Sequence, residues 1–256
     1  MSEKIDNLKV IILAAGRGSR LNSEEAHMPK HMRSVAGKPI LDYILKAVDF
    51  VDKKDILIIV GFMKEIIIEA FPDYPFFIQP IGEEFDYGTG AAVRYTKETI
   101  GEYSGDILVL MGDSPLMTKE TLLNLYHEHK EKNNDCTNLS YEVNKNLAFG
   151  RIIRDKNNNF CGIVENRDAT DEQKKITEYN SGNAIFNSKK LFEQLANLKN
   201  NNKSGEYYLT DIPKLFMDNN YKVGIYKSNN GNELYGADSA ENLVYIESIL
   251  KNKFAK

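Results

Sequence analysis

The sequence predicts an α/β fold built on a doubly wound, mixed sheet. Three aliphatic runs, within residues 10–13, 55–60 and 106–111, are typical of strands that are buried on both faces of a parallel sheet. Segments with apolar residues at helical spacing separate these runs. Alternating strands and helices predict ligand binding at the carboxyl ends of the strands. From Asp135 onward, apolar and polar residues alternate between turn signals, which predicts a β-rich second half.

The elements expected in the first half follow from periodicity and turn residues. Apolar residues recur at helical spacing after Pro39, and proline suits an early helix position. A later helix carries His127 and His129, which cannot share a helical face and are expected on the surface. The full set is strands at 10–13, 55–60, 76–79 and 106–111, and helices at 40–48, 64–71, from Gly88 onward and at 118–132.

The second half is expected to contain hairpin-connected strands and a few helices. Three consecutive asparagines at 157–159 are a turn signal between two strands. A short helix follows Asp168, with that residue or Thr170 as its cap, and the segment before Asp211 is expected to cap another. The full set is strands at 139–143, 149–154, 161–165, 178–186 and 222–226, and helices at 168–173, 211–219 and 240–253.

Composition predicts a soluble globular protein. The chain has 256 residues, of which 42% are hydrophobic and 27% charged, which is long enough for one large α/β domain or two small ones with a sizeable core. Its net charge of −4 disfavours a nucleic-acid or membrane-surface partner, and no apolar run approaches the roughly 20 residues that span a bilayer. The only two cysteines, Cys136 and Cys161, are too few for a disulfide framework. We therefore expect a cytoplasmic protein whose oligomeric state the sequence leaves open.

The first strand opens into a loop of small residues. Gly16 and Gly18 can adopt positive φ, and the lack of bulky side chains lets backbone N–H groups approach a ligand. Arg17, Arg20 and Lys30 add three cations, so this segment is expected to bind a polyphosphate. The alternative is the glycine turn that any α/β protein needs after a strand. The candidate nucleotide-binding residues here are Leu13, Ala14, Ala15, Gly16, Arg17 and Gly18.

The spacing of this loop separates it from two common phosphate-binding motifs. Leu21 stands where the dinucleotide fingerprint has its third glycine, and the Gly-Lys-Ser/Thr of a P-loop is missing. With Arg20 and Pro29-Lys30, the segment resembles the signature of sugar-nucleotide pyrophosphorylases, Leu-x-x-Gly-x-Gly-x-Arg-(Leu/Met)…Pro-Lys. The resemblance implies a Rossmann-like, glycosyltransferase-A-like nucleotidyltransferase fold. The spacer 21–28 is a few residues longer than the family's, which leaves the position of Lys30 open.

Two aspartates are candidate magnesium ligands. Asp113 follows a glycine at the end of a central strand, where hard cations find carboxylate oxygens, although an Asx-turn before Pro115 is the structural alternative. Asp238 is assigned by resemblance alone. It ends Tyr-Gly-Ala-Asp, where the family has Gly-Val-Asn or Gly-(Ile/Val)-Asp with a second metal ligand.

Segments in the second half resemble the sugar site of the bacterial N-acetylglucosamine-1-phosphate uridyltransferases. In order, these are Phe149–Ile152, Ile163–Glu165, Asp168–Thr170 and Glu178–Gly182, followed by Gly-Glu-Tyr-Tyr-Leu-Thr-Asp at 205–211. The resemblance implies that the amino sugar is bound by Gly150, Glu165 and Asn180. Short polar groups on rigid strands suit a neutral sugar. The alternative is that these polar strand ends only satisfy backbone groups.

Two residues are candidates for reading the base. Gly88-Thr89-Gly90 is a turn and cap in isolation, but in the uridyltransferases a similar segment lies beside the base, after a glutamine that pairs with uracil. Counting back without gaps places Glu83 at the glutamine position, and a carboxylate suits the adjacent donors of guanine. A small insertion within 80–87 would instead restore Gln79. UTP is therefore the first choice and GTP or another triphosphate the alternative.

The resemblance implies a complete reaction. The sugar phosphate attacks the α-phosphorus of a nucleoside triphosphate, Mg²⁺ offsets the charge, and a nucleotide sugar and pyrophosphate form. Arg17 and Arg20 would hold the leaving phosphates, and Arg20, Lys30 and Asp113 are the catalytic candidates. The domain is expected over residues 1–256, with a nucleotide-binding half at about 8–134, a sugar-binding half at about 135–238 and a C-terminal helix at 239–256.

The sequence disfavours two alternative functions, and it leads us to expect that one further domain is absent. A catalytically inactive nucleotide-sugar binder is disfavoured by the presence of both candidate metal carboxylates. A dehydrogenase is disfavoured by Leu21 and Arg20. Hexapeptide repeats are absent, so we expect no left-handed β-helix and no acetyltransferase activity. The expected product, UDP-N-acetylglucosamine, would serve nucleotide-sugar supply to the cell envelope.

Overall fold

The computed structural model describes residues 4–18 and 21–254. The chain forms two compact units, each assembled from separate stretches of sequence. The first unit comprises Met1–Ile81, Leu110–Leu122 and Asn232–Lys256, and the second comprises Gly82–Val109 and Leu123–Gly231. Strand β6 (Asp106–Met111) begins in the second unit and ends in the first, and helix α5 (Lys119–Glu131) passes back into the second.

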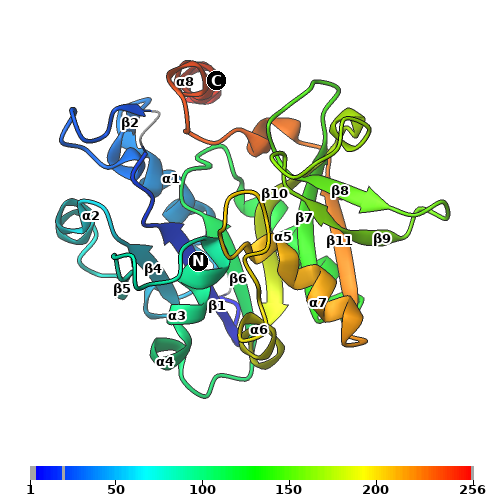
Figure 1. Cartoon of the computed structure of the whole chain (residues 1–256). Helices are drawn as coiled ribbons and strands as arrows, with labels where there is room; N and C mark the ends of the chain where they lie inside the picture. Colours follow the sequence, from blue (N-terminus) through cyan, green and yellow to red (C-terminus); the bar gives the residue numbers. More distant parts are fainter. Residues whose placement is uncertain (1–3, 19–20, 255–256) are drawn as a thin grey trace. The chain divides into compact units, whose positions relative to one another are not determined.

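The first unit contains three parallel strands, β1 (Leu8–Ala14), β4 (Ile56–Val60) and β5 (Phe76–Ile78). The register runs from Val10 opposite Ile56 to Ala14 opposite Val60, and β5 pairs with β4 on its other side (Figure 1). All of β4 is buried, as the aliphatic runs predicted. Because the strands are parallel, the loops that follow them leave from one edge of the sheet.

Short helices, 3₁₀ turns and a two-stranded hairpin surround these strands. They are η2 (Lys30–Met32), the hairpin β2 (Ser34–Val35) with β3 (Lys38–Pro39), α1 (Ile40–Ala47), η3 (Lys53–Asp55), α2 (Lys64–Ala70), η6 (Gly231–Leu234) and α8 (Ala240–Phe254). Pro39 is the residue before α1 rather than its first residue. One apolar cluster joins Ile40 of α1 and Ile246 of α8 to Leu116 and Ala237, so the segments after β6 and before α8 are packed against each other.

The second unit has a mixed sheet. Its strands follow the order β6, β10 (Glu178–Asn187), β7 (Cys136–Glu142) and β11 (Val223–Ser228), with β10 antiparallel to both neighbours and β11 parallel to β7. The hairpin of β8 (Arg151–Arg154) and β9 (Phe160–Val164) pairs with the start of β10 and extends away from it (Figure 1). The mixed α/β sheet expected from the sequence is therefore confirmed.

The helices of the second unit include one that the sequence pattern did not predict. They are α3 (Thr89–Tyr95), α4 (Lys97–Ile100), η4 (Gln173–Lys175), α6 (Ser188–Leu195), η5 (Leu209–Asp211) and α7 (Ile212–Asp218). The missed helix, α6, follows β10 directly, and the side chain of Asn187 caps it by accepting from the amide of Lys190. Among the described residues, no helix is both long and apolar enough to cross a bilayer.

Three local expectations were wrong. His129 is 2% exposed, because its ring lies 2.9 Å from the hydroxyl of Thr137 and 3.5 Å from the carboxylate of Asp106. His127 alone is on the surface. The helix expected at 168–173 is only the 3₁₀ turn η4, whose N-cap residue is Glu172, while Thr170 forms a reciprocal pair of hydrogen bonds with Gln173. The N-terminus of α7 has no side-chain capping hydrogen bond, so the segment that leads into Asp211 does not cap this helix as expected.

Candidate functional site

The loop after β1 has the backbone that a phosphate-binding loop needs. Gly18 has φ of +64°, and a Cβ there would lie 2.7 Å from Ser23 Oγ and 2.9 Å from Lys30 Cβ, so only glycine fits. Gly16 and Arg17 are exposed. Leu13 and Ala14, also candidates, form the buried end of β1. We call residues 15–18 the phosphate loop.

Neighbouring strands fix the ends of the phosphate loop. The carbonyl of Ala15 accepts from the amide of Phe62, and a Cβ on Gly61 would lie 3.0 Å from that carbonyl. The carbonyl of Leu13 accepts from the amide of Gly112, at 3.0 Å. Arg20 lies outside the described residues.

The long spacer 21–28 is a compact turn that returns the chain to the phosphate loop. Its backbone is bonded internally, with the amide of Met28 donating to the carbonyl of Ser23 and the amide of Ala26 donating to that of Asn22. Ser23 is fully buried. Lys30 follows this turn and lies beside the loop, where its Cε would be 3.6 Å from a Cβ on Gly16.

Lys30 and Asp113 form the central charge pair of the first unit. Lys30 Nζ lies 2.5 Å from Asp113 Oδ2, and the two side chains are 17% and 13% exposed. Burial alone would raise the pKa of the Asp113 carboxyl, but the charge of Lys30 and its hydrogen bond, helped by His31, bring that pKa below its ordinary value. Asp113 is thus an ionised carboxylate at neutral pH, partnered by a cation that can also contact a phosphate.

His31 lies beneath this pair as a neutral ring. Its side chain is 1% exposed, and burial, with the nearby charge of Lys30, lowers its pKa to about 3, against the opposing effect of Asp113. A Cβ on Gly112 would lie 3.3 Å from the His31 ring and 2.7 Å from the carbonyl of Leu13. Sequence reasoning did not select His31, although its position next to Lys30 was the available signal.

Asp238 belongs to the segment that supports Asp113. The amide of Ala237 donates to the carbonyl of Asp113 at 2.7 Å, and a Cβ on Gly236 would lie 3.5 Å from Asp113 Oδ1. The carboxylate of Asp238 accepts from Asn242 Nδ2 at 2.6 Å, which fixes it at the start of α8. The structure therefore brings the two candidate metal-ligand segments together.

The donor set suits a cation that shares its ligands with substrate. Within residues 4–18 and 21–254, no cluster of three or more His, Cys, Asp or Glu side chains could hold a metal by itself. Mg²⁺ is commonly bound through one or two carboxylates together with water and substrate phosphates, so Asp113 and Asp238 are an adequate protein contribution.

The two candidates for reading the base have different surroundings. Gln79 directly follows β5, and its amide donates to the carbonyl of Val60 at 2.8 Å, which fixes it at the same edge of the sheet as the phosphate loop. Glu83 is exposed in the segment between Gln79 and Gly88.

Gly88 and Thr89 are held by the segment 205–211, which we call the strap. A Cβ on Gly88 would lie 2.5 Å from the carbonyl of Tyr207, and that carbonyl accepts from the amide of Gly90. The hydroxyl oxygen of Thr89 accepts from the amide of Leu209 at 3.1 Å. The hydroxyl hydrogen of Thr89 stays available to a ligand, whereas the amide of Gly90 is already bonded.

The three predicted sugar-binding residues lie together in the second unit. The amide of Asn180 donates to the carbonyl of Gly150 at 2.8 Å, and a Cβ on Gly150 would lie 3.4 Å from both carboxylate oxygens of Glu165. Asn180 is 5% exposed, and among the described residues its Oδ1 has no hydrogen-bond partner. A buried amide oxygen without a partner is costly unless a ligand supplies a donor.

The strap adds residues that sequence reasoning did not assign to the site. The hydroxyl of Thr210 donates to Glu165 Oε1 at 2.7 Å. Asp211 follows, and Glu165, Asp168, Glu206 and Asp211 form what we call the acidic cluster, in which the charges influence one another. The match of the strap to the family motif was the signal that could have identified Thr210.

Burial sets the protonation of the acidic cluster. It raises the pKa of Glu165, with contributions from Asp168 and Glu206 and an opposing hydrogen bond from Thr210. It also raises the pKa of Asp211 to about 6, aided by Glu165 and Asp168. The cluster therefore carries less negative charge below neutral pH than four free carboxylates would.

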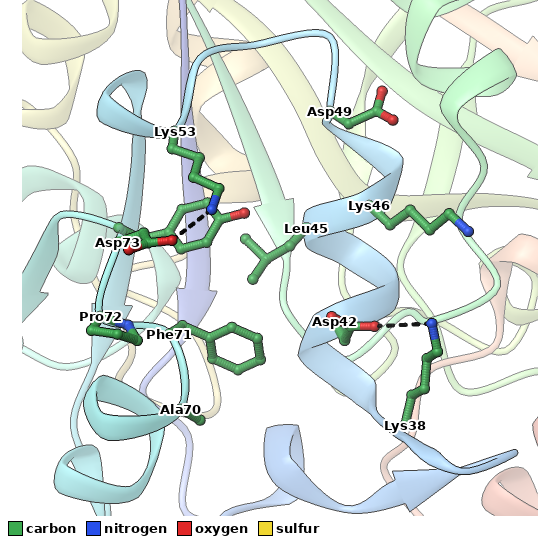
Figure 2. Close-up of a pocket in the computed structure, with 11 residues that line it drawn as sticks. Lys38, Asp42, Leu45, Lys46, Asp49, Lys53, Ala70, Phe71, Pro72 and Asp73 are labelled. Atoms are coloured by element: carbon green, nitrogen blue, oxygen red, sulfur yellow. Dashed lines mark hydrogen bonds and ion pairs between the residues drawn. The ribbon is translucent and has the colours of Figure 1, made fainter.

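A surface pocket of the first unit is separate from these residues. It has a volume of about 580 Å³ and lies between α1 and residues 70–74, with Phe71 and Leu45 on its walls (Figure 2). Lys53 pairs with Asp73 and Lys38 with Asp42, as the dashed lines of Figure 2 show. The pocket's own acids thus neutralise two of its lysines, and no predicted site residue lines it.

Comparison with known sequences identifies relatives along nearly the whole chain. A sequence profile described as nucleotidyl transferase matches residues 9–231. The chain is 36% identical over 243 residues to the "Bifunctional protein GlmU" of Streptococcus mutans serotype c, covering 95% of this chain and 52% of the relative. It is 39% identical over 247 residues to the protein of that name from Clostridioides difficile, covering 96% and 52%. The chain thus spans about half the length of the curated relatives it matches.

Comparison with solved structures supports the fold. A protein from Bacillus anthracis described as a glucose-1-phosphate thymidylyltransferase superposes with a TM-score of 0.71 at 20% sequence identity, covering 94% of each chain. At this level of identity the likeness concerns the fold alone.

Proposed function

This chain belongs to the nucleotidyl transferase family, and on that premise we propose that it joins N-acetylglucosamine 1-phosphate to UTP, releasing UDP-N-acetylglucosamine and pyrophosphate. The observation that carries the proposal is the meeting of the phosphate loop, Lys30 and Asp113 at the carboxyl edge of the parallel strands. Open α/β sheets bind ligands at this edge.

The phosphate loop and its cations are proposed to bind the triphosphate. The open backbone around Gly16 and the left-handed turn at Gly18 allow close approach to phosphate oxygens. Lys30, adjacent to Gly16, would contact the reacting phosphates, and Arg17 and Arg20 would hold the phosphates that leave. Each of these groups neutralises charge that develops on the phosphates during transfer.

Asp113 and Asp238 are proposed to hold Mg²⁺. When bound, this ion supplies Lewis-acid stabilisation of the phosphate charge. The protein's own contribution is to keep Asp113 ionised and oriented through Lys30, and to fix Asp238 through Asn242.

Gly150, Glu165 and Asn180 are proposed to bind the sugar. The absence of a side chain at Gly150 leaves room beside Glu165, and the unpartnered Oδ1 of Asn180 can accept from a sugar N–H or hydroxyl. Thr210 orients Glu165. The resemblance of segments in this half to the sugar site of the bacterial N-acetylglucosamine-1-phosphate uridyltransferases supports an N-acetylated amino sugar as substrate.

UTP is proposed as the nucleotide because Gln79 lies at the same edge as the phosphate loop. An amide can donate to O4 of uracil and accept from N3–H, whereas a carboxylate only accepts. Gly88 and Thr89 of the second unit are proposed as further nucleotide-binding residues.

The test is a substrate matrix. The purified chain is incubated with each of UTP, GTP, CTP, ATP and dTTP against N-acetylglucosamine, glucose and mannose 1-phosphates, and pyrophosphate release is measured with Mg²⁺ and with EDTA. We expect the fastest release from UTP with N-acetylglucosamine 1-phosphate, only with Mg²⁺, and none from the D113N variant. Binding of UDP-N-acetylglucosamine without any pyrophosphate release would identify an inactive nucleotide-sugar binder instead.

A further inference from the structure

Arg151 is a fully buried arginine at the start of β8, with 0% exposure. Burying a guanidinium is costly unless its charge is compensated or its donors are satisfied. None of the ion pairs formed by the described residues includes Arg151. The hydrogen-bond acceptors of Arg151 are instead neutral, which is unusual for a buried cation.

Four of the five N–H donors of the guanidinium bind acceptors from three segments of the second unit: the loop 145–149, Asn166 and Lys174. Nη1 donates to the carbonyl of Phe149 at 2.5 Å and to Asn166 Oδ1 at 2.6 Å. Nη2 donates to Asn146 Oδ1 at 3.1 Å and to the carbonyl of Lys174 at 3.3 Å. A planar fork of fixed donors can bridge several acceptors in this way, whereas an ammonium cannot.

The ring of Tyr179 completes the surroundings. It lies 5.0 Å from the guanidinium carbon, at cation–π distance. Tyr179 is itself 1% exposed, and its hydroxyl donates to the carbonyl of Lys145 and accepts from the amide of Leu147. The loop 145–149 is therefore tied to β10 both through Arg151 and through Tyr179.

Every proposed sugar-binding residue is next in sequence to a member of this network. Gly150 precedes Arg151, Glu165 precedes Asn166, and Asn180 follows Tyr179. Strands β8 and β10 also pair at this position, because Tyr179 lies opposite Arg151. A displacement of the guanidinium would shift all three residues at once.

We infer that Arg151 is a positioning residue that sets the relative geometry of the sugar site, an inference that rests on the proposed function. Arg151 does not need to touch the sugar for this role. Its neutral partners hold three backbone segments in one arrangement, and the recognition groups on those segments depend on that arrangement. The loss of Arg151 should therefore weaken sugar binding while leaving the nucleotide-binding residues of the first unit unchanged.

The experiment compares R151M and R151K with a matched arginine of the same strand. Arg154 pairs with Glu178 at 2.7 Å and contacts none of the three sugar-binding residues through a described hydrogen bond, so R154M controls for general loss of stability. For each variant we measure KM for N-acetylglucosamine 1-phosphate, KM for UTP, kcat and the melting temperature. R151M is chosen because methionine fills a similar space without a buried charge.

We expect R151M to raise KM for the sugar phosphate at least tenfold and KM for UTP less than twofold. R151K should have a KM for the sugar phosphate between those of R151M and wild type, because it restores the charge but not the four hydrogen bonds. R154M should lower the melting temperature and leave both KM values within twofold. Equal changes in both KM values for R151M, no change in either, or the same sugar defect in R154M would each overturn the inference.

Single-contact variants keep the test valid if R151M does not fold. N166A removes one acceptor next to Glu165 and should raise the sugar KM at least threefold more than the UTP KM; equal or absent changes would overturn the role. Calorimetric titration with the sugar phosphate separates this inference from the proposed function. A wild type that binds the sugar but transfers no nucleotide contradicts the activity, and the ratio of the R151M and wild-type Kd values then decides the role of Arg151. A wild type that binds no sugar phosphate contradicts both.

Discussion

Lys30 Nζ and Asp113 Oδ2 are 2.5 Å apart in an ion pair whose side chains are 17% and 13% exposed. The pair joins the segment after the phosphate loop to the end of β6, two parts of the sequence separated by 83 positions. Under the proposed function, substrate phosphates would compete with Asp113 for Lys30, and Mg²⁺ would compete with Lys30 for Asp113.

The first prediction concerns Asp113. D113N should reduce turnover at least a hundredfold, because the site loses the carboxylate that we propose holds Mg²⁺, and each roughly 1.4 kcal/mol of lost transition-state stabilisation is tenfold in rate. The measurement is pyrophosphate release at saturating substrates. Asp55, which pairs with Lys9 at 2.7 Å in the same unit, provides the matched control D55N. A D113N rate above about a tenth of wild type would contradict the metal assignment.

The second prediction concerns Lys30. K30M should lower kcat and raise KM for the triphosphate, because the variant removes a cation beside the phosphate loop and leaves Asp113 without its counter-charge. K30R should not restore the rate. Lys30 Cβ lies close to Gly18, so the larger planar guanidinium cannot take the position that the ammonium has beside Asp113. K9M is the control, since Lys9 belongs to an ion pair of similar exposure. Kinetics of K30M equal to those of K9M would mean that the polyphosphate binds elsewhere.

The strands were predictable because burial on both faces leaves a simple signature. The aliphatic runs of β1, β4 and β6 are found within a residue or two of their expected bounds. Helix α6 was missed because it begins directly after a strand with three polar residues before its first apolar one. The change from the two-residue period of a strand to the 3.6-residue period of a helix is therefore hidden. Asn187, the cap of that helix, was its clearest signal.

The site was predictable where chemistry depends on local sequence and unpredictable where it depends on the path of the chain. Asp113 follows a glycine at a strand end, a pattern visible in the sequence. The position of Lys30 depends on the turn 21–28, in which Asn22 and His27 adopt positive φ. No short sequence motif predicts this backbone conformation. The contact of Thr210 with Glu165 joins residues 45 positions apart, so only the fold reveals it.

The third prediction concerns the pH dependence of stability. The pKa of Asp211 is about 6 in the folded protein, against 3.8 for a free aspartate, because of burial and of the charges of Glu165 and Asp168. Between these pH values the folded state holds a proton that the unfolded state has released, so this carboxyl makes stability fall as pH rises from about 4 to about 6. Above about pH 6 the loss is complete.

D211N should therefore be more stable than wild type at pH 8 and about equal to it at pH 4. The two pKa values correspond to about 3 kcal/mol at full burial, which solvent around a partly exposed carboxyl reduces to about 1–2 kcal/mol. Urea titrations at both pH values measure the free energy of unfolding. D218N is the control, since Asp218 ends the same helix and pairs with Lys214 on the surface. A D211N stabilisation of equal size at pH 4 and pH 8 would show that this carboxyl is not the cause.

The last prediction concerns the base. Gln79 is fixed by its amide at the carboxyl edge that carries the phosphate loop, whereas Glu83 is exposed in the segment that follows. Q79A should therefore raise KM for UTP about tenfold, because two hydrogen bonds to the base edge are lost at about 0.5–1.5 kcal/mol each, while E83A should leave it within twofold. Both alanine variants are measured with UTP and with GTP at a fixed sugar phosphate, and E84A provides an exposed neighbour as control. If Glu83 reads the base instead, the pattern reverses: wild type turns over GTP at least tenfold faster than UTP, and E83A raises KM for GTP while Q79A changes nothing. The carboxylate would then accept from N1–H and the 2-amino group of guanine, two donors that uracil lacks.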